Sequence, residues 1–283
     1  MAIARHGSGV SAGLRALGSQ IHPVFMLPPL ASSLFGAILA GDMSVPLAVL
    51  HLAAVFSGLY TAHVKDGYVD FYQRGEDEDH PLTATGCRVA LAAATIAFTI
   101  ALVAISLLVG PLAALLTLPG WIIGYFHAPQ LDMHPVTATA GYPSGIALAL
   151  VGGYYVQAET FAPVPLAFAA VFLLVLSGIK VVDDAQDYEY DRSIGKRTVA
   201  VELGRAHARR TAYGLMAVGL LTVLALAAAT VFPPSAALAP IVFAGVATLT
   251  HRADAELSTM LLIRGSYLFL AVLVAAVWFQ PLR

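Results

Sequence analysis

The stretch VPLAFAAVFLLVLSGI, residues 164–179, runs directly into KVVDDAQDYEYDRSIGKRT, residues 180–198. The first part is apolar over almost the length that a membrane-spanning helix needs. Between Asp183 and Thr198 there are five acids and three bases, whereas only 11% of the whole chain is charged. Acidic groups at the end of a membrane helix cost free energy, so their presence there indicates a functional role. The junction therefore predicts a membrane helix with a polar site at its end.

The composition of the 283-residue chain is that of an integral membrane protein, with 59% hydrophobic residues. A soluble domain usually carries about 25% charged residues. The net charge of −2 leaves no basic footprint for nucleic acid. A single cysteine, Cys87, excludes an internal disulfide. We expect one domain over residues 1–283, with residues 1–21 as a cytosolic lead-in or interfacial helix.

Apolar runs predict an all-α, polytopic membrane protein with about nine spans. The predicted spans are residues 23–41, 45–64, 88–109, 111–127, 142–157, 163–182, 210–231, 236–251 and 259–279. Lys and Arg gather in the loops after the second and sixth spans, and such loops are usually cytoplasmic. The charge bias therefore predicts a plasma-membrane protein whose N-terminus and two charged loops face the cytoplasm.

Two acid-rich segments follow apolar helices, KDGYVDFYQRGEDED at residues 65–79 and KVVDDAQDYEYDRSIGK at residues 180–196. Acids four residues apart recur in both: Asp66 and Asp70 in the first, Asp183, Asp187 and Asp191 in the second. At that spacing, side chains on a helix project from one face, where like charges repel. Mg²⁺ relieves such repulsion and commonly bridges to phosphates. The similarity of the two segments suggests two related halves of one bundle that face a shared site.

Basic residues are interleaved with these acids, and a diphosphate held by Mg²⁺ still needs Lys or Arg for its remaining oxygens. The predicted diphosphate-binding residues are Lys65, Arg74, Lys180, Lys196 and Arg197. A charged head and an apolar bundle together suit an amphiphile with a diphosphate group and a hydrocarbon tail. Metal ions neutralise a leaving diphosphate, and an apolar cavity keeps water from the allylic cation. The alternative is an ordinary solvated loop, which the repeated spacing disfavours.

At these residues the chain resembles the UbiA superfamily of intramembrane prenyltransferases. Asp184, Asp187 and Asp191-Arg192 fit its second motif, Asp-x-x-Asp-x-x-x-Asp-Arg, and GKRTVAVELG at residues 195–204 fits the element that follows. The resemblance implies a helical bundle of nine spans around a central cavity that opens to membrane lipid. It also implies Mg²⁺-dependent transfer of a prenyl group from an isoprenoid diphosphate to a lipophilic acceptor.

The first motif departs from the family pattern Asn-Asp-x-x-Asp. With Asp70 as its second acid, Asp66 stands where Asn is usual, Gly67 replaces the first Asp, and Asp77 becomes the last acid. A second register leaves Ala62 and His63 in the Asn-Asp positions and keeps Asp66 and Asp70 in the site. The resemblance implies Asp66, Asp70, Asp187 and Asp191 as catalytic residues. The implied metal ligands are Asp66, Asp70, Asp77, Asp184, Asp187 and Asp191.

The segment after Gly75 and the element GKRTVAV resemble the menaquinone-pathway branch, which prenylates 1,4-dihydroxy-2-naphthoate. This favours an aromatic or quinone precursor as acceptor, with Tyr125, His127 and Tyr142 as candidate acceptor-binding residues. Asp132 and His134 of the same loop could also orient the acceptor. A glyceryl-phosphate lipid or carotenoid acceptor remains open. So does a terpene cyclase on the same fold, or a cation or metabolite transporter with an acidic gate. The oligomeric state is not predicted.

Overall fold

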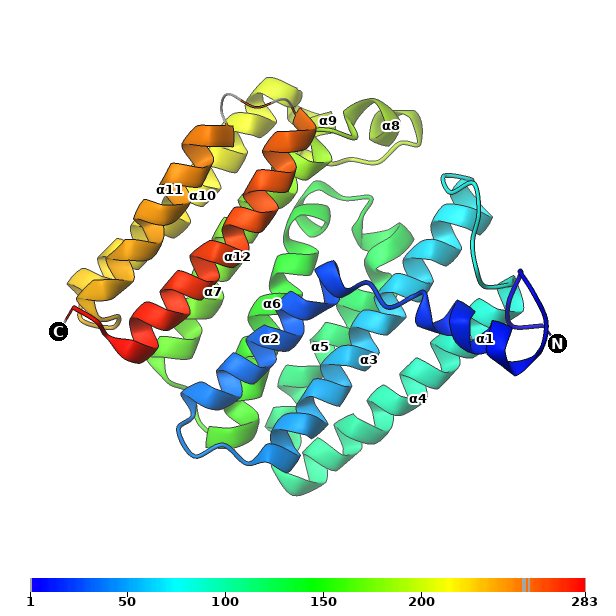
Figure 1. The fold of residues 1–283 in the computed structure, drawn as a ribbon, viewed down its shortest axis with the longest axis horizontal. Helices are drawn as coiled ribbons and strands as arrows, with labels where there is room; N and C mark the ends of the chain where they lie inside the picture. Colours follow the sequence, from blue (N-terminus) through cyan, green and yellow to red (C-terminus); the bar gives the residue numbers. More distant parts are fainter. Residues whose placement is uncertain (1, 251–252, 254, 283) are drawn as a thin grey trace. The chain divides into compact units, whose positions relative to one another are not determined.

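The computed structural model describes residues 2–250, 253 and 255–282, and within them every named element is helical (Figure 1). The all-α prediction is therefore confirmed. Helices lie at each of the predicted spans, and their bounds extend or trim the predicted ranges by several residues. These helices are α2 (Pro23–Leu39), α3 (Val45–Val69), α4 (Ala84–Leu108), α5 (Pro111–Phe126), α6 (Pro135–Ala158), α7 (Pro163–Asp184), α10 (Arg205–Ala228), α11 (Leu238–Thr250) and α12 (Ala255–Phe279).

Six helices in the described part of the chain are long and apolar enough to cross a membrane. The number rises to seven if α1 (Gly9–Gly18) and α2, which are bent by 66°, form one span. The helix over Pro234–Thr250 is apolar but shorter. In α6, the Gly, Thr and Pro residues of PVTATAGYPSG lower the mean hydropathy. The membrane character of the chain is clear, while nine crossings stay a prediction.

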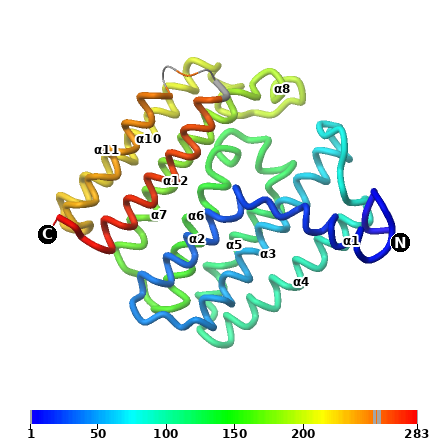
Figure 2. Tube along the Cα trace, viewed as in Figure 1, coloured from blue at the N-terminus to red at the C-terminus, as the bar shows by residue number. Residues whose placement is uncertain are grey.

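The contacts divide the chain into two compact units. Figure 2 traces the chain with colours that follow the residue number. The first comprises Met1–Met133 with Ser144–Phe161, and the second His134–Pro143 with Ala162–Arg283. In the first unit α3 packs against α2, α4 and α5. In the second, α7 packs against α10 and α12, and α11 packs against α12. Each unit thus supports one acid-rich segment, the first at the end of α3 and the second at the end of α7.

Small residues let the helices approach closely, as is usual where membrane helices pack. At Gly178 of α7 a side-chain Cβ would lie 2.6 Å from the carbonyl oxygen of Ala212 on α10. Large, exposed apolar side chains mark the helix faces that point away from the helix contacts. On α4, Leu107 is 81% exposed and Leu108 is 69% exposed, and such apolar surface suits contact with lipid rather than water.

One glycine pair on α5 tests this packing. Alanine at Gly124 would place its Cβ 2.6 Å from the carbonyl oxygen of Gly58 on α3, whereas alanine at Gly120 would meet nothing within 4 Å. We expect Gly124→Ala to lower the free energy of unfolding by about 1–3 kcal/mol, because backbone atoms yield little in a packed contact. Gly120→Ala should be neutral or slightly stabilising, since alanine favours helix. Thermal unfolding in detergent would show this, and equal midpoints for the two variants would contradict it.

Candidate functional site

The first acid-rich segment continues α3 as a helix through the π-helical turn η1 (Asp70–Arg74). The Asp70 N–H donates to the carbonyl oxygen of Asp66, so the two carboxylates lie on one helix face, as the spacing predicts. The helix stops at Gly75, whose φ of 64° is a left-handed conformation that glycine adopts easily. The predicted pair Asp66 and Asp70 is thus placed on a rigid helix end.

Arg74 connects this helix end to the segment after α5. Its Nη1 donates to Asp70 Oδ1 at 3.2 Å, and its Nη2 donates to Asp132 Oδ2 at 2.6 Å. The Arg74 side chain is only 10% exposed, so water screens these contacts little. Asp132, a candidate acceptor contact from the sequence, is therefore a partner of a predicted diphosphate-binding residue.

The other predicted base of this segment, Lys65, lies over an aromatic ring. Its Nζ is 5.5 Å from the ring centre of Tyr125, and the Tyr125 ring stacks on Trp121 with centroids 5.1 Å apart. A cation over an aromatic face is attracted by the ring quadrupole. The first unit therefore brings a predicted diphosphate-binding residue into contact with a predicted acceptor-binding residue.

The structure explains why position 67 is glycine. A Cβ there would lie 2.7 Å from Cε1 of His80, which is 3% exposed. His80 Nε2 is 3.4 Å from Cys87 Sγ, and its ring lies 5.9 Å from that of Phe71. Burial lowers the pKa of His80. Asp77, the predicted third acid, lies exposed on the loop between η1 and His80.

A double substitution tests this contact. We expect Gly67→Asp to reduce activity several-fold, because the new side chain would push His80 out of its buried position. His80→Ala makes room, so adding it to Gly67→Asp should return much of the loss. Prenyl transfer by the two single variants and the double variant would be compared. A Gly67→Asp defect of the same size with and without the His80 side chain would refute the explanation.

The second acid-rich segment is interrupted rather than continuous. The helix α7 ends at Asp184, and the short helix α8 (Tyr188–Ser193) begins after a turn. The prediction that Asp183 and Asp187 share a face of one helix is therefore wrong, although the Asp191 N–H does donate to the carbonyl oxygen of Asp187 at 2.8 Å. At the turn the Gln186 side chain donates to Thr259 Oγ1 of α12, which fixes the chain where it leaves α7.

Lys180 holds the two acids at the end of α7. Its Nζ donates to Asp184 Oδ1 at 2.6 Å and to Asp183 Oδ2 at 3.0 Å. Asp184 is 5% exposed, and its second oxygen, Oδ2, is buried with no hydrogen-bond partner among the described residues. A buried carboxylate oxygen without a partner costs free energy. Asp184 Oδ2 is thus an acceptor that a cation or donor would satisfy.

The remaining residues of the second segment differ in burial. Asp191 is 3% exposed and lies 3.4 Å from Lys196 Nζ. Burial raises the pKa of Asp191 despite the opposing charge of Lys196. Asp187 is exposed. Arg197, 61% exposed, donates instead to Glu202 at 2.6 Å, so the structure gives this predicted diphosphate-binding residue a partner outside the acidic motif.

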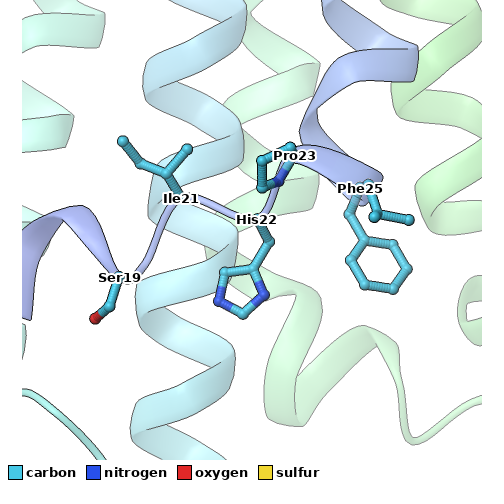
Figure 3. A pocket seen from close by; sticks show the side chains of 6 residues that line it. Ser19, Ile21, His22, Pro23 and Phe25 are labelled. Atoms are coloured by element: carbon cyan, nitrogen blue, oxygen red, sulfur yellow. The ribbon is translucent and has the colours of Figure 1, made fainter.

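The predicted acceptor-binding residues fall in both units. Tyr125 and His127, the first residue of the π-helical turn η2 (His127–Leu131), belong to the first unit, and Tyr142 on α6 belongs to the second. A hollow of about 240 Å³ lies at the bend between α1 and α2. It is lined by the side chains of Ser19, Ile21, His22, Pro23, Val24 and Phe25 (Figure 3).

Bases contact several of the acids: Arg74 contacts Asp70, Lys180 contacts Asp183 and Asp184, and Lys196 contacts Asp191. Among the described residues, no three His, Cys, Asp or Glu side chains converge on a ready metal site. Sequence reasoning missed two residues that shape the segments, His80 and Gln186. A histidine within the acidic loop and a glutamine inside the second motif were the available signals.

Comparison with known proteins gives a family and several related folds. A sequence model of the UbiA prenyltransferase family matches residues 29–273. Among curated proteins, no sequence matches at a significant level. The structure resembles a digeranylgeranylglyceryl phosphate synthase with a TM-score of 0.71 at 13% identity, covering 94% of this chain and 96% of that one.

Two archaeal structures are similar in the same way. A UbiA homologue from Archaeoglobus fulgidus bound to DMAPP and Mg²⁺ has a TM-score of 0.64 at 18% identity, covering 92% of this chain and 98% of that one. The apo structure of a UbiA homologue from Aeropyrum pernix K1 has a TM-score of 0.64 at 17% identity, with 90% and 97% covered. At these identities the likeness establishes a shared fold.

Proposed function

We propose, because this chain belongs to the UbiA prenyltransferase family, that it transfers a polyprenyl group from an isoprenoid diphosphate to a membrane-soluble acceptor with Mg²⁺ as cofactor. The observation that carries the proposal is Asp184, whose Oδ2 is buried without a hydrogen-bond partner among the described residues, beside Lys180. An acidic oxygen next to a base suits a cation together with a phosphate. The solved relative that binds DMAPP and Mg²⁺ supports the same chemistry.

The donor set fits Mg²⁺, since it consists of carboxylates without cysteine. The proposed ligands are Asp66, Asp70, Asp77, Asp184, Asp187 and Asp191. When bound, Mg²⁺ supplies Lewis-acid neutralisation of the diphosphate. The burial of Asp184 and Asp191, at 5% and 3% exposed, supports their part in the set more strongly than that of the exposed Asp77.

The diphosphate oxygens would be bound by the predicted basic residues, which are Lys65, Arg74, Lys180, Lys196 and Arg197. Arg74 and Lys196 are fixed by carboxylates, and Lys65 by the Tyr125 ring. In the reaction, the bond between C1 of the prenyl chain and the diphosphate oxygen breaks, and the diphosphate leaves with the electron pair. The nucleophilic atom of the acceptor bonds to C1 and loses a proton, for which His127 is the proposed base. The apolar helices would exclude water from the allylic cation.

For the acceptor we propose an aromatic or quinone precursor, bound by Tyr125, His127 and Tyr142. Its support is the resemblance of GKRTVAV and of the loop after Gly75 to the naphthoate-prenylating branch. The hollow beside His22, whose ring stacks on that of His63 with centroids 4.8 Å apart, adds aromatic surface near the first motif. We place the protein in the plasma membrane with both acidic segments in the cytoplasm, on the bias of Lys and Arg.

The test is prenyl transfer by the purified protein in lipid vesicles. Geranylgeranyl diphosphate and longer isoprenoid diphosphates are supplied with Mg²⁺ and with dihydroxynaphthoate, 4-hydroxybenzoate or geranylgeranylglyceryl phosphate, and the products are identified by mass spectrometry. We expect a prenylated aromatic product that EDTA abolishes. A prenylated glyceryl phosphate would move the acceptor to that lipid. A cyclised hydrocarbon formed without acceptor would assign a terpene cyclase, and no Mg²⁺-dependent product from any donor would refute the proposal.

A further inference from the structure

The contact between Arg74 and Asp132 joins two segments that are 58 residues apart in the sequence. It is the shorter of the two contacts that the guanidinium makes with carboxylates, at 2.6 Å against 3.2 Å to Asp70. The three side chains are 10%, 12% and 20% exposed for Arg74, Asp132 and Asp70. A charge-assisted contact with so little water around it is stronger than an ordinary surface ion pair.

Both ends of this contact are anchored by the backbone. The Asp132 N–H donates to the carbonyl oxygen of His127 at 2.9 Å, which closes the turn η2. Arg74 ends the turn η1, where the Glu76 N–H donates to the carbonyl oxygen of Asp70 at 2.8 Å. The guanidinium is therefore held at two nitrogens by two carboxylates on rigid turns. Arginine has five N–H donors in a planar fork, so donors remain for a phosphate.

We infer that Asp132 is a positioning residue that acts through Arg74. This inference rests on the function proposed above. By holding Arg74, Asp132 orients the free N–H groups towards the diphosphate and limits the hold of Arg74 on Asp70. Without Asp132, the charge of Arg74 falls on Asp70 alone and competes there with Mg²⁺. Groups that orient metal ligands in this way typically change metal affinity or activity by about 10- to 100-fold when they are removed.

The experiment is a double-mutant cycle on the full chain in lipid vesicles, with wild type, Asp132→Asn, Arg74→Gln and both together. Mn²⁺ affinity in the presence of inorganic pyrophosphate, followed by electron paramagnetic resonance, gives a readout that does not depend on turnover. The Michaelis constant for geranylgeranyl diphosphate and kcat are measured in parallel. Thermal unfolding checks that each variant is folded.

We expect Asp132→Asn alone to weaken Mn²⁺ binding and raise the Michaelis constant by about 10-fold, with a smaller change in kcat. In the Arg74→Gln background the same substitution should change both by less than about 2-fold, because coupled residues are not additive. Asp132→Glu, which keeps the carboxylate, should stay close to wild type and serves as the second variant if Asp132→Asn does not fold.

Equal effects of Asp132→Asn in both backgrounds would overturn the inference, because Asp132 would then act without Arg74. No effect in the wild-type background, or an Asp132→Glu defect as large as that of Asp132→Asn, would overturn it as well. If wild type transfers no prenyl group with Mg²⁺, the proposed function fails. If wild type transfers and the cycle shows no coupling, only the role of Asp132 fails.

Discussion

Replacing Asp184 by asparagine should lower kcat/KM for prenyl transfer by about 100-fold or more, because a buried charged group aimed at a reacting complex contributes several kcal/mol. Asp184 is 5% exposed, and its Oδ2 is buried without a hydrogen-bond partner among the described residues. Asparagine has nearly the same shape but offers a neutral, weaker ligand. We expect the Mg²⁺ concentration for half-maximal activity to rise with the loss.

The matched control is Asp183→Asn. Asp183 is the preceding residue and contacts the same Lys180 amine, at 3.0 Å against 2.6 Å for Asp184. Its side chain is 40% exposed, so its charge is already solvated and its loss should cost less than about 5-fold. Mg²⁺ titrations of initial rates in lipid vesicles separate the two variants. Equal losses for both would show that the charge near Lys180 matters rather than the buried oxygen, and the assignment of Asp184 as a ligand would be abandoned.

Replacing Lys180 by methionine should make stability depend on Mg²⁺. Lys180 is the base within 3.0 Å of both Asp183 and Asp184, and its loss leaves a buried carboxylate without a counter-charge. Removing a partner from such a group costs about 1–3 kcal/mol, and because Lys180 is 31% exposed we expect the lower part of that range. Mg²⁺ would bind the freed carboxylate of Asp184 more tightly and restore the stability, since a ligand that binds the folded state stabilises it.

Thermal unfolding in detergent, with EDTA and across an Mg²⁺ titration, measures this. The midpoint of Lys180→Met should lie several degrees below wild type in EDTA and approach it as Mg²⁺ rises. Arg197→Met is the control, because Arg197 is exposed and donates to Glu202, and it should follow wild type throughout. A Lys180→Met midpoint that stays low at every Mg²⁺ concentration would place Asp184 outside the metal site.

Features that depend on local sequence were predictable. Apolar runs predicted the positions of α2 to α7 and α10 to α12, because a backbone in lipid must satisfy its own hydrogen bonds. The four-residue spacing of Asp66 and Asp70 placed them on one face, since the helix continues from α3 into η1 without a break. The same spacing failed at Asp183 and Asp187, because the helix stops at Asp184 and Gln186 bonds to a residue 73 positions away.

The sequence by itself determined the membrane class, the helices and the two acid-rich segments, because burial in lipid and helical periodicity act over neighbouring residues. Only the tertiary structure decided which base holds which acid. Arg74 reaches Asp132, and Asp184 keeps one buried oxygen beside Lys180. It also decided why residue 67 is glycine, since His80 occupies that space. Such contacts join residues distant in the chain, and packing rather than spacing selects them.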